Sequence, residues 1–132
     1  MLYQVATAQG RKLFLYDTFS GIPMRSECDH HNVGDFSDCS YEEIKEAFPL
    51  ATVVKGVFPD SMVEMPPIAF VHADADQYES TKNICLTLGP RMVKEGSILF
   101  DDYRALAGCV KAVDECFPNR MVLPDRRALV SF

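Results

Sequence analysis

Five aspartates stand at or directly after short apolar runs of the sequence: Asp17, Asp74, Asp76, Asp101 and Asp102. Apolar runs of this kind predict strands, and open α/β sheets bind their ligands beyond the carboxyl ends of the strands. Carboxylates crowded at such an edge repel one another unless they share a positive charge. Their oxygens suit a hard cation such as Mg²⁺, with water or substrate oxygens completing the coordination shell.

Two acidic pairs follow consecutive apolar runs. Asp74-Ala75-Asp76 ends one run, and Asp101-Asp102 ends the next. Neighbouring parallel strands lie about 4.8 Å apart, so both pairs are expected within reach of a single cation at one edge of the sheet. The structural alternatives are a helix N-cap, which we expect of Asp76, and a turn role for Asp101-Asp102. We favour the shared cation.

Other residues with metal-binding or catalytic side chains give weaker signals. Four of them lie in one stretch of the chain, namely Cys28, His30, His31 and Cys39. Their spacing fits none of the usual zinc patterns, so we favour a polar surface loop. His72 lies inside an apolar run, where we expect a hydrogen-bonded core histidine rather than a catalytic one. The sequence contains no nucleophile elbow, Walker loop or Gly-rich dinucleotide fingerprint.

The apolar runs that must position these residues predict six strands. They cover residues 13–16, 52–58, 68–73 and 97–100, with two more around 121–123 and 128–130. Near-continuous apolar runs of this length are typical of strands that are buried on both faces.

Helical patterns fall between the strands. Ser40 with Glu43 forms a capping box that opens a helix ending near Phe48, and Asp76 with Glu79 predicts a similar start for a longer helix. One apolar stripe follows in Tyr78, Thr81, Cys85, Leu88 and Met92, and a second in Leu106, Val110, Val113 and Phe117. Strands that alternate with helices predict a single α/β domain over residues 1–132, Rossmann-like and three-layered, with a mostly parallel sheet and helices on both faces.

Composition excludes several classes of protein. The chain has 132 residues, of which 48% are apolar and 24% charged, as in ordinary globular domains. The net charge of −6 opposes nucleic-acid binding. No apolar run approaches the ~18 residues of a membrane span. The first residues lack the basic stretch of a secretory signal, and the five cysteines show no paired framework, so we expect reduced thiols and a cytoplasmic protein.

Several segments together resemble one enzyme family. Residues 72–81 read His-Ala-Asp-Ala-Asp-Gln-Tyr-Glu-Ser-Thr, and Asp101-Asp102-Tyr103 follows. Upstream, residues 17–23, 34–36 and 55–60 match in the same order, and Gly108-Cys109 matches downstream. From about Leu2 to about Phe117 the chain resembles the macrocin O-methyltransferase family, class I S-adenosylmethionine-dependent enzymes that methylate sugar hydroxyls in antibiotic biosynthesis.

The resemblance implies roles for particular residues. It places a divalent metal, Mg²⁺, on Asp74, Asp101 and Asp102, with Asp74 also helping to take the proton of the acceptor hydroxyl. It places the ribose hydroxyls of S-adenosylmethionine on Asp17 and the adenine beside Gly56, Val57 and Phe58. The implied partner is a small hydroxylated sugar or natural product.

Members of this family carry a first strand and a Gly-rich loop ahead of the helix that residues 1–8 resemble. That strand is central in their sheets, and the loop holds the methionine end of the cofactor. We therefore expect this chain alone to bind S-adenosylmethionine weakly or not at all. We also expect strands 13–16 and 68–73 either to pair directly or to be covered by a second copy in a homodimer.

Two other functions compete with methyl transfer. The first is a non-catalytic binding or oligomerisation module that keeps the fold of the family. The second is a phosphoryl-transfer or receiver-type acidic pocket. Such a pocket has its acid pair early in the chain, whereas Asp101-Asp102 comes late, which argues against it.

Overall fold

The computed structural model describes residues 1–132. The chain forms two compact units. Unit 1 consists of Met1–Pro23 and Gly34–Val63, and unit 2 of Met24–Val33 and Glu64–Phe132. The assignment of all 132 residues to one domain stays a prediction. No helix is both long and apolar enough to cross a membrane.

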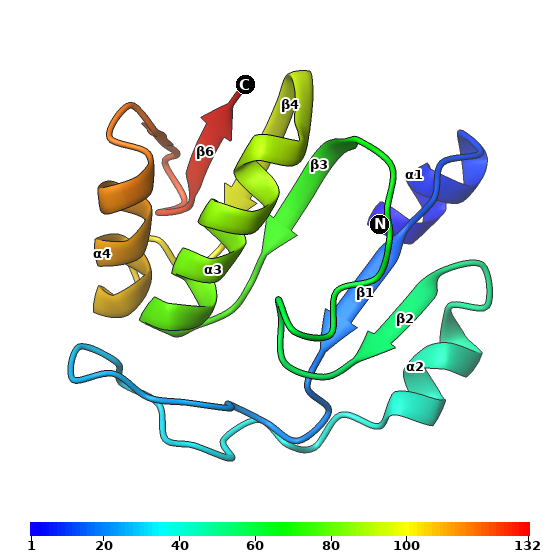
Figure 1. The fold of residues 1–132 in the computed structure, drawn as a ribbon, viewed down its shortest axis with the longest axis horizontal. Helices are drawn as coiled ribbons and strands as arrows, with labels where there is room; N and C mark the ends of the chain where they lie inside the picture. The colour runs from blue at the N-terminus through cyan, green and yellow to red at the C-terminus, as the bar shows by residue number, and fades with distance from the viewer. The chain divides into compact units, whose positions relative to one another are not determined.

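Unit 1 is a small βαβ unit, preceded in the sequence by a helix. Its elements are α1 (Leu2–Ala8), β1 (Phe14–Asp17), α2 (Tyr41–Ala47) and β2 (Thr52–Lys55) (Figure 1). β1 and β2 pair in parallel, which places Asp17 opposite Lys55 at the carboxyl end of the pair. The predicted capping box is confirmed, because the Ser40 side chain accepts a hydrogen bond from the Glu43 amide at 3.5 Å.

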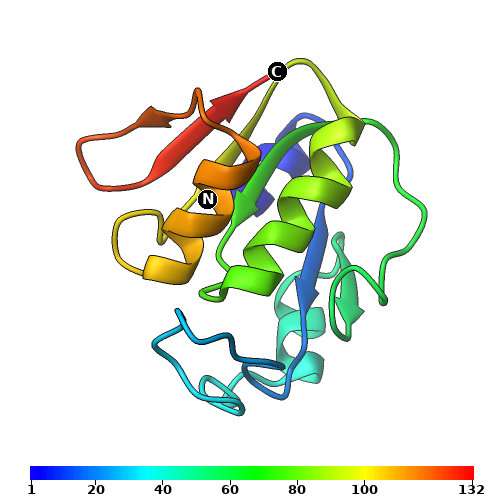
Figure 2. The same ribbon diagram turned by 60° about the vertical axis from the view of Figure 1, so that its left-hand side comes forward.

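Unit 2 contains the larger sheet. Its elements are β3 (Ile68–Ala73), α3 (Tyr78–Leu88), the short 3₁₀ helix η1 (Gly89–Arg91), β4 (Met92–Phe100), α4 (Ala107–Cys116), β5 (Met121–Val122) and β6 (Ala128–Ser131). The four strands lie in the order β3-β4-β6-β5. In Figures 1 and 2, α3 and α4 lie side by side on one face of this sheet.

The predicted parallel pairing holds for β1 with β2 and for β3 with β4. The last two strands differ, because β4 pairs with β6, and β6 with β5, in antiparallel fashion. Only residues 123–127 connect β5 to β6, and a short connection of this kind joins antiparallel neighbours. β1 and β3 belong to separate sheets, one in each unit.

The core of unit 2 lies between the sheet and its two helices. Ile98 and Phe100 of β4, Val113 of α4 and Ala128 of β6 have no exposed surface. The predicted stripe of α3 is confirmed for Tyr78, Thr81, Cys85 and Leu88, all of which are buried. The extension of that stripe to Met92 is wrong: Met92 begins β4, since Pro90 has no N–H with which to continue the helix.

Candidate functional site

The carboxyl ends of β3 and β4 meet at one edge of the sheet in unit 2. Ala73 is the register partner of Phe100, and the Asp101 amide donates to the Ala73 carbonyl at 3.0 Å. The residues that follow each strand therefore leave the sheet at the same place, as the spacing of the acidic pairs predicts.

Three carboxylates gather at this edge. Asp74, Asp76 and Asp102 each offer an oxygen, and the three oxygens lie within 4.8 Å of one another. We call this set the acid cluster. Asp102 Oδ2 is buried and has no hydrogen-bond partner. A buried carboxylate oxygen without a partner is costly unless a proton or a cation compensates it. The donor set, all carboxylate oxygens, fits a hard divalent cation such as Mg²⁺.

The electrostatics of the acid cluster also favour a compensating positive charge. Partial desolvation of its carboxyl group raises the pKa of Asp74 above its ordinary value, and the negative charges of Asp102 and Asp101 raise it further. Burial likewise raises the pKa of Asp102, reinforced by the negative charges of Asp76 and Asp101. Raised carboxyl pKa values mean that these charges are disfavoured together, which is the condition that a bound cation relieves.

The metal-free fold is expected to lose stability as the pH rises through the raised pKa values of Asp74 and Asp102. Between the unfolded and the folded pKa the native chain binds more protons than the unfolded chain, so stability is highest on the acidic side and falls with rising pH. Asp102→Asn should flatten this part of the profile and stabilise the protein near neutral pH. Thermal melts in EDTA over the acidic-to-neutral range check this, and an unchanged slope in the variant would contradict it.

Asp101 has different neighbours from the other acids. Its Oδ1 lies 3.5 Å from His72 Nε2 and 3.7 Å from Arg127 Nη1. The structure therefore brings together two of the three metal ligands implied by the resemblance, Asp74 and Asp102, and adds Asp76 to them. Asp101 instead lies next to His72 and Arg127.

Two expectations about neighbouring residues are wrong. Asp76 is not the N-cap of α3, because Asp76 has a left-handed backbone with φ +57° and the cap residue is Gln77. His72 is not a core histidine. It is exposed on β3, because Val71 and Ala73 on either side of it point to the core and His72 therefore points to the opposite face, next to Asp101.

Asp29 is the residue that sequence reasoning missed. It is 5% exposed, and its Oδ1 accepts from the backbone amide of Tyr78, the first residue of α3, at 2.8 Å. The cap of the helix that follows the acid cluster thus comes from a loop far away in sequence. Asp29 stands in an irregular stretch without periodicity, so no local signal in the sequence points to this contact.

The loop after Asp102 is anchored to α4 by Tyr103. This side chain is 3% exposed, donates to Asp114 Oδ1 at 2.6 Å and accepts from Arg120 Nε at 2.7 Å. The Asp102 carbonyl accepts from the amides of Ala105 and Leu106 in the same loop. The backbone that carries Asp102 is therefore fixed on both sides of this residue.

The residues predicted for the cofactor lie at the carboxyl ends of β1 and β2 in unit 1. The Gly56 amide donates to the Asp17 carbonyl at 3.0 Å, so the two positions are adjacent. Asp17 is exposed, and its Oδ1 accepts from the Phe19 amide at 2.7 Å. Gly56 has φ +136°, and a Cβ there would lie 2.9 Å from Ser61 Cβ. The predicted strand over 52–58 therefore ends at Lys55, because this backbone conformation breaks the pairing.

Val57 and Phe58 follow directly and are half-buried. The Phe58 ring contacts the Tyr16 ring edge to face, with 5.5 Å between the ring centroids. The structure thus groups Asp17, Gly56, Val57 and Phe58 within unit 1, and their role in cofactor binding stays a prediction.

The alternative zinc site does not form. Within unit 2, Cys28, His30 and His31 do not lie close enough together to share an ion. The His30 and His31 rings instead contact each other edge to face at 5.2 Å between centroids. His30 and Cys39 are exposed, which agrees with the polar surface loop that we favour.

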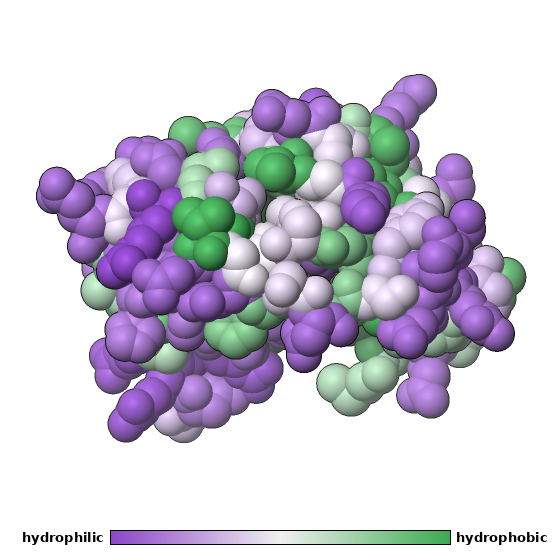
Figure 3. Space-filling model, turned by 90° about the horizontal axis from the view of Figure 1, so that it is seen from below, coloured by the Kyte–Doolittle hydropathy of each residue, from purple (hydrophilic) through white to green (hydrophobic).

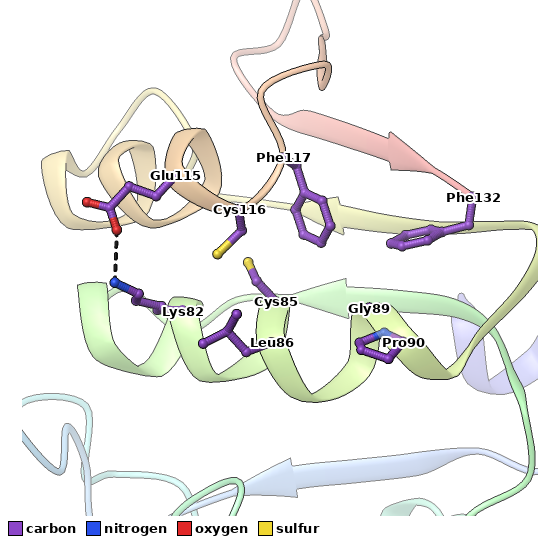
Figure 4. Close-up of a pocket in the computed structure, with 9 residues that line it drawn as sticks. All are labelled: Lys82, Cys85, Leu86, Gly89, Pro90, Glu115, Cys116, Phe117 and Phe132. Atoms are coloured by element: carbon purple, nitrogen blue, oxygen red, sulfur yellow. Dashed lines mark hydrogen bonds and ion pairs between the residues drawn. The ribbon is translucent and has the colours of Figure 1, made fainter.

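A groove of about 620 Å³ lies toward the C-terminal ends of α3 and α4 (Figure 4). Lys82 and Glu115 form an ion pair of 2.9 Å at one end of it, and Phe117 and Phe132 contact each other at the other end. Cys85 and Cys116 point toward one another between these ends, and burial raises the pKa of the Cys85 thiol. None of the residues that we assign to metal or cofactor lines this groove.

On the face shown in Figure 3, hydrophilic side chains surround small, separate apolar patches. Exposed apolar patches of large area mark interaction sites more often than scattered residues do. The face drawn in Figure 3 therefore has no broad apolar surface.

Comparisons with known proteins agree with the fold. The chain is 28% identical over 122 residues to demethyldecarbamoylnovobiocin O-methyltransferase from Streptomyces niveus, a match that covers 80% of this chain and 47% of that protein. The chain thus spans about half the length of this curated relative.

Two solved structures have the same fold. The O-methyltransferase NovP matches with a TM-score of 0.82 and 22% identity, over 98% of this chain and 64% of that one. The calicheamicin methyltransferase CalS11 matches with a TM-score of 0.74 and 20% identity, over 99% of this chain and 67% of that one. The predicted α/β methyltransferase fold is confirmed.

One family covers almost the whole sequence. The family described as Macrocin-O-methyltransferase (TylF) matches residues 1–125, which include every residue of the acid cluster and of the predicted cofactor group. The resemblance seen in residues 72–81 and in Asp101-Asp102-Tyr103 is thereby confirmed, and the chain belongs to the macrocin O-methyltransferase family.

Proposed function

We propose that this chain serves the transfer of a methyl group from S-adenosylmethionine to a hydroxyl of a small acceptor, with Mg²⁺ as the metal. The observation that carries the proposal is the acid cluster, in which Asp102 Oδ2 is buried without a partner beside two further carboxylates. Family membership supports the reaction class, because the relatives above are O-methyltransferases by name.

Asp74 and Asp102 are the residues that would hold the cation, with Asp101 or Asp76 as the third carboxylate. A bound Mg²⁺ supplies Lewis-acid chemistry, lowering the pKa of an acceptor hydroxyl and orienting it. Asp74 is exposed, so its carboxylate can also accept the proton that the acceptor gives up.

Asp17, Gly56, Val57 and Phe58 would bind the nucleoside part of S-adenosylmethionine. Asp17 offers an exposed carboxylate for ribose hydroxyls at the end of β1. Gly56 lies next to it and has no side chain to obstruct a ligand, and Phe58 offers an aromatic ring. Methyl transfer also needs in-line positioning of donor and acceptor.

The acceptor in this proposal is a hydroxylated sugar or a natural product that carries one. The names of two relatives, which refer to novobiocin and calicheamicin, support this substrate class.

A panel of such acceptors with labelled S-adenosylmethionine tests the function. Because we expect this chain alone to bind the cofactor weakly at best, the assay uses S-adenosylmethionine in large excess, and label transfer under these conditions should require Mg²⁺ and be lost in Asp102→Asn. Transfer that persists in EDTA would refute the metal requirement. Absence of both transfer and cofactor binding would favour the non-catalytic binding module.

We also propose that the chain forms a homodimer through the free edge of β3. This strand pairs only with β4, and Phe70 on it is 44% exposed. Exposed edges of this kind are usually covered, and two-fold dimers are the commonest closed assemblies.

Light scattering at micromolar concentration is expected to give twice the chain mass of 14.8 kDa. Phe70→Lys places a charge on the edge strand and should shift the protein toward the monomer. A wild-type protein that scatters as a 14.8 kDa monomer would contradict the proposal.

A further inference from the structure

We propose that Asp29 is a positioning residue for the acid cluster, acting through the chain segment that joins Asp76 to α3. The inference rests on the proposed function, because it takes the acid cluster to be the metal site. Asp29 does not belong to that cluster, and no motif in the sequence singles it out.

Both carboxylate oxygens of Asp29 are engaged with backbone amides. Oδ1 accepts from the Tyr78 amide at 2.8 Å, and Oδ2 accepts from the Ser26 amide at 2.7 Å. The side chain of Gln77, the N-cap residue of α3, makes no capping bond itself. Asp29 therefore supplies the side-chain cap of α3 from another loop, with a negative charge at the positive end of the helix dipole.

Gln77 adds a second connection between Asp29 and this segment. It is 1% exposed, and with its amide oriented to satisfy both of its atoms, Nε2 donates to Asp29 Oδ2 at 2.7 Å and to the Met24 carbonyl at 3.1 Å. The two residues that directly follow Asp76 are thus both bound to one buried carboxylate.

The first turn of α4 packs closely against Asp29. A Cβ at Gly108 would lie against Asp29 Oδ1 and 2.9 Å from the Tyr78 nitrogen, so only glycine leaves room for this contact. Asp29 is therefore held by its own loop, by the start of α3 and by the start of α4.

The contacts of Asp29 support the acid cluster at one end of the short segment that runs from Asp74 to Asp76. Asp74 directly follows β3, whose position the sheet fixes, whereas Asp76 is followed by the residues that Asp29 binds. Asp76 also has φ +57°, a conformation that persists only where its surroundings hold it. Without Asp29 the Asp76 end of the segment loses its support, and the spacing of the three carboxylates is no longer fixed.

Binding of Mn²⁺ measured by electron paramagnetic resonance tests the proposal, because the signal of free Mn²⁺ reports affinity without an activity assay. Asp29→Ala is expected to raise the Kd for Mn²⁺ at least tenfold, in the range found for residues that orient metal ligands. Asp29→Asn keeps an oxygen for the Tyr78 amide and should restore most of the affinity. Val113→Ala, which truncates a fully buried α4 side chain elsewhere in the core, controls for general destabilisation and should stay within twofold of the wild type.

An Asp29→Ala protein that binds Mn²⁺ within twofold of the wild type would overturn the inference while leaving the proposed function intact. An equal loss in Val113→Ala would overturn it too, since any weakening of the core would then suffice. Failure of the wild type to bind Mn²⁺ would refute the metal site and this inference together. If Asp29→Ala does not fold, Gln77→Leu serves as a second test. It removes the hydrogen bond between Gln77 and Asp29 but leaves Asp29 in place, and it is expected to raise the Kd for Mn²⁺ severalfold. An unchanged Kd in that variant overturns the proposal.

Discussion

Mg²⁺ is expected to raise the free energy of unfolding of the wild-type chain by about 2.7 kcal/mol when the ion is present at a hundredfold excess over its Kd. The reason is linkage: the folded chain brings Asp74, Asp76 and Asp102 together, and the unfolded chain does not. Asp102→Asn removes the negative charge and replaces one carboxylate oxygen with an amide nitrogen, so it should abolish the response. The metal-free variant should be as stable as the wild type or more so, because a repelling charge is gone.

Urea unfolding with Mg²⁺ and with EDTA measures this effect. Glu79→Gln, which neutralises an exposed acid on α3, is the matched control and should keep the full response. A wild-type midpoint that does not respond to Mg²⁺ would refute the shared-cation site. A response retained in Asp102→Asn would place the ion elsewhere.

The same measurement identifies the third carboxylate. The resemblance implies Asp101, whereas the structure places Asp76 in the acid cluster and turns Asp101 toward His72 and Arg127. The variant that loses the Mg²⁺ response, Asp76→Asn or Asp101→Asn, marks the third ligand, and loss in both would mean that the ion draws Asp101 away from its present partners.

Gly108→Ala is expected to destabilise the fold by about 3 kcal/mol, the sum of overpacking and of a disturbed buried hydrogen bond to a charged group. The added methyl group would occupy the space of Asp29 Oδ1 and approach the Tyr78 nitrogen to 2.9 Å. Both groups are buried, so neither has free space into which to move.

Gly89→Ala is the matched control. Its backbone is right-handed helical, and its Cβ would meet Phe117 Cζ at a tight but adjustable 3.3 Å. The stability change there should stay within about 1 kcal/mol. Urea titrations followed by circular dichroism compare the two variants. Equal effects at Gly108 and Gly89 would show that the contact with Asp29 is not the cause.

Local patterns in the sequence predict the elements of this fold well and their mutual contacts less well. β3 covers the predicted residues 68–73, because an apolar run bounded by prolines and an aspartate determines a strand locally. Strand ends also place Asp74 and Asp102 together, since strand direction alone brings the ends of β3 and β4 to one edge.

The errors concern contacts between segments that are distant in sequence. An apolar run gives no sign that His72 lies on an edge strand and faces Asp101. The N-cap pattern at Asp76 is a local rule, and it fails because Asp29 supplies the acceptor from another loop. Predicting Asp29 would require knowing that Gly108 and Tyr78 enclose it, which is information held only in the tertiary structure.

The hydrogen bonds of the buried Tyr103 hydroxyl affect the rates at which a cation binds to the acid cluster and dissociates from it. Its bonds to Asp114 and Arg120 attach the loop after Asp102 to α4 and to the turn that follows α4, and the Asp101 amide donates to the Ala73 carbonyl. Segments tied to the core in this way open only with the core, so their amide hydrogens exchange slowly with solvent. The Asp101 amide should therefore be among the slowly exchanging ones. The rate at which a cation enters would then be set by the loss of its hydration water and not by motion of the loop that receives it.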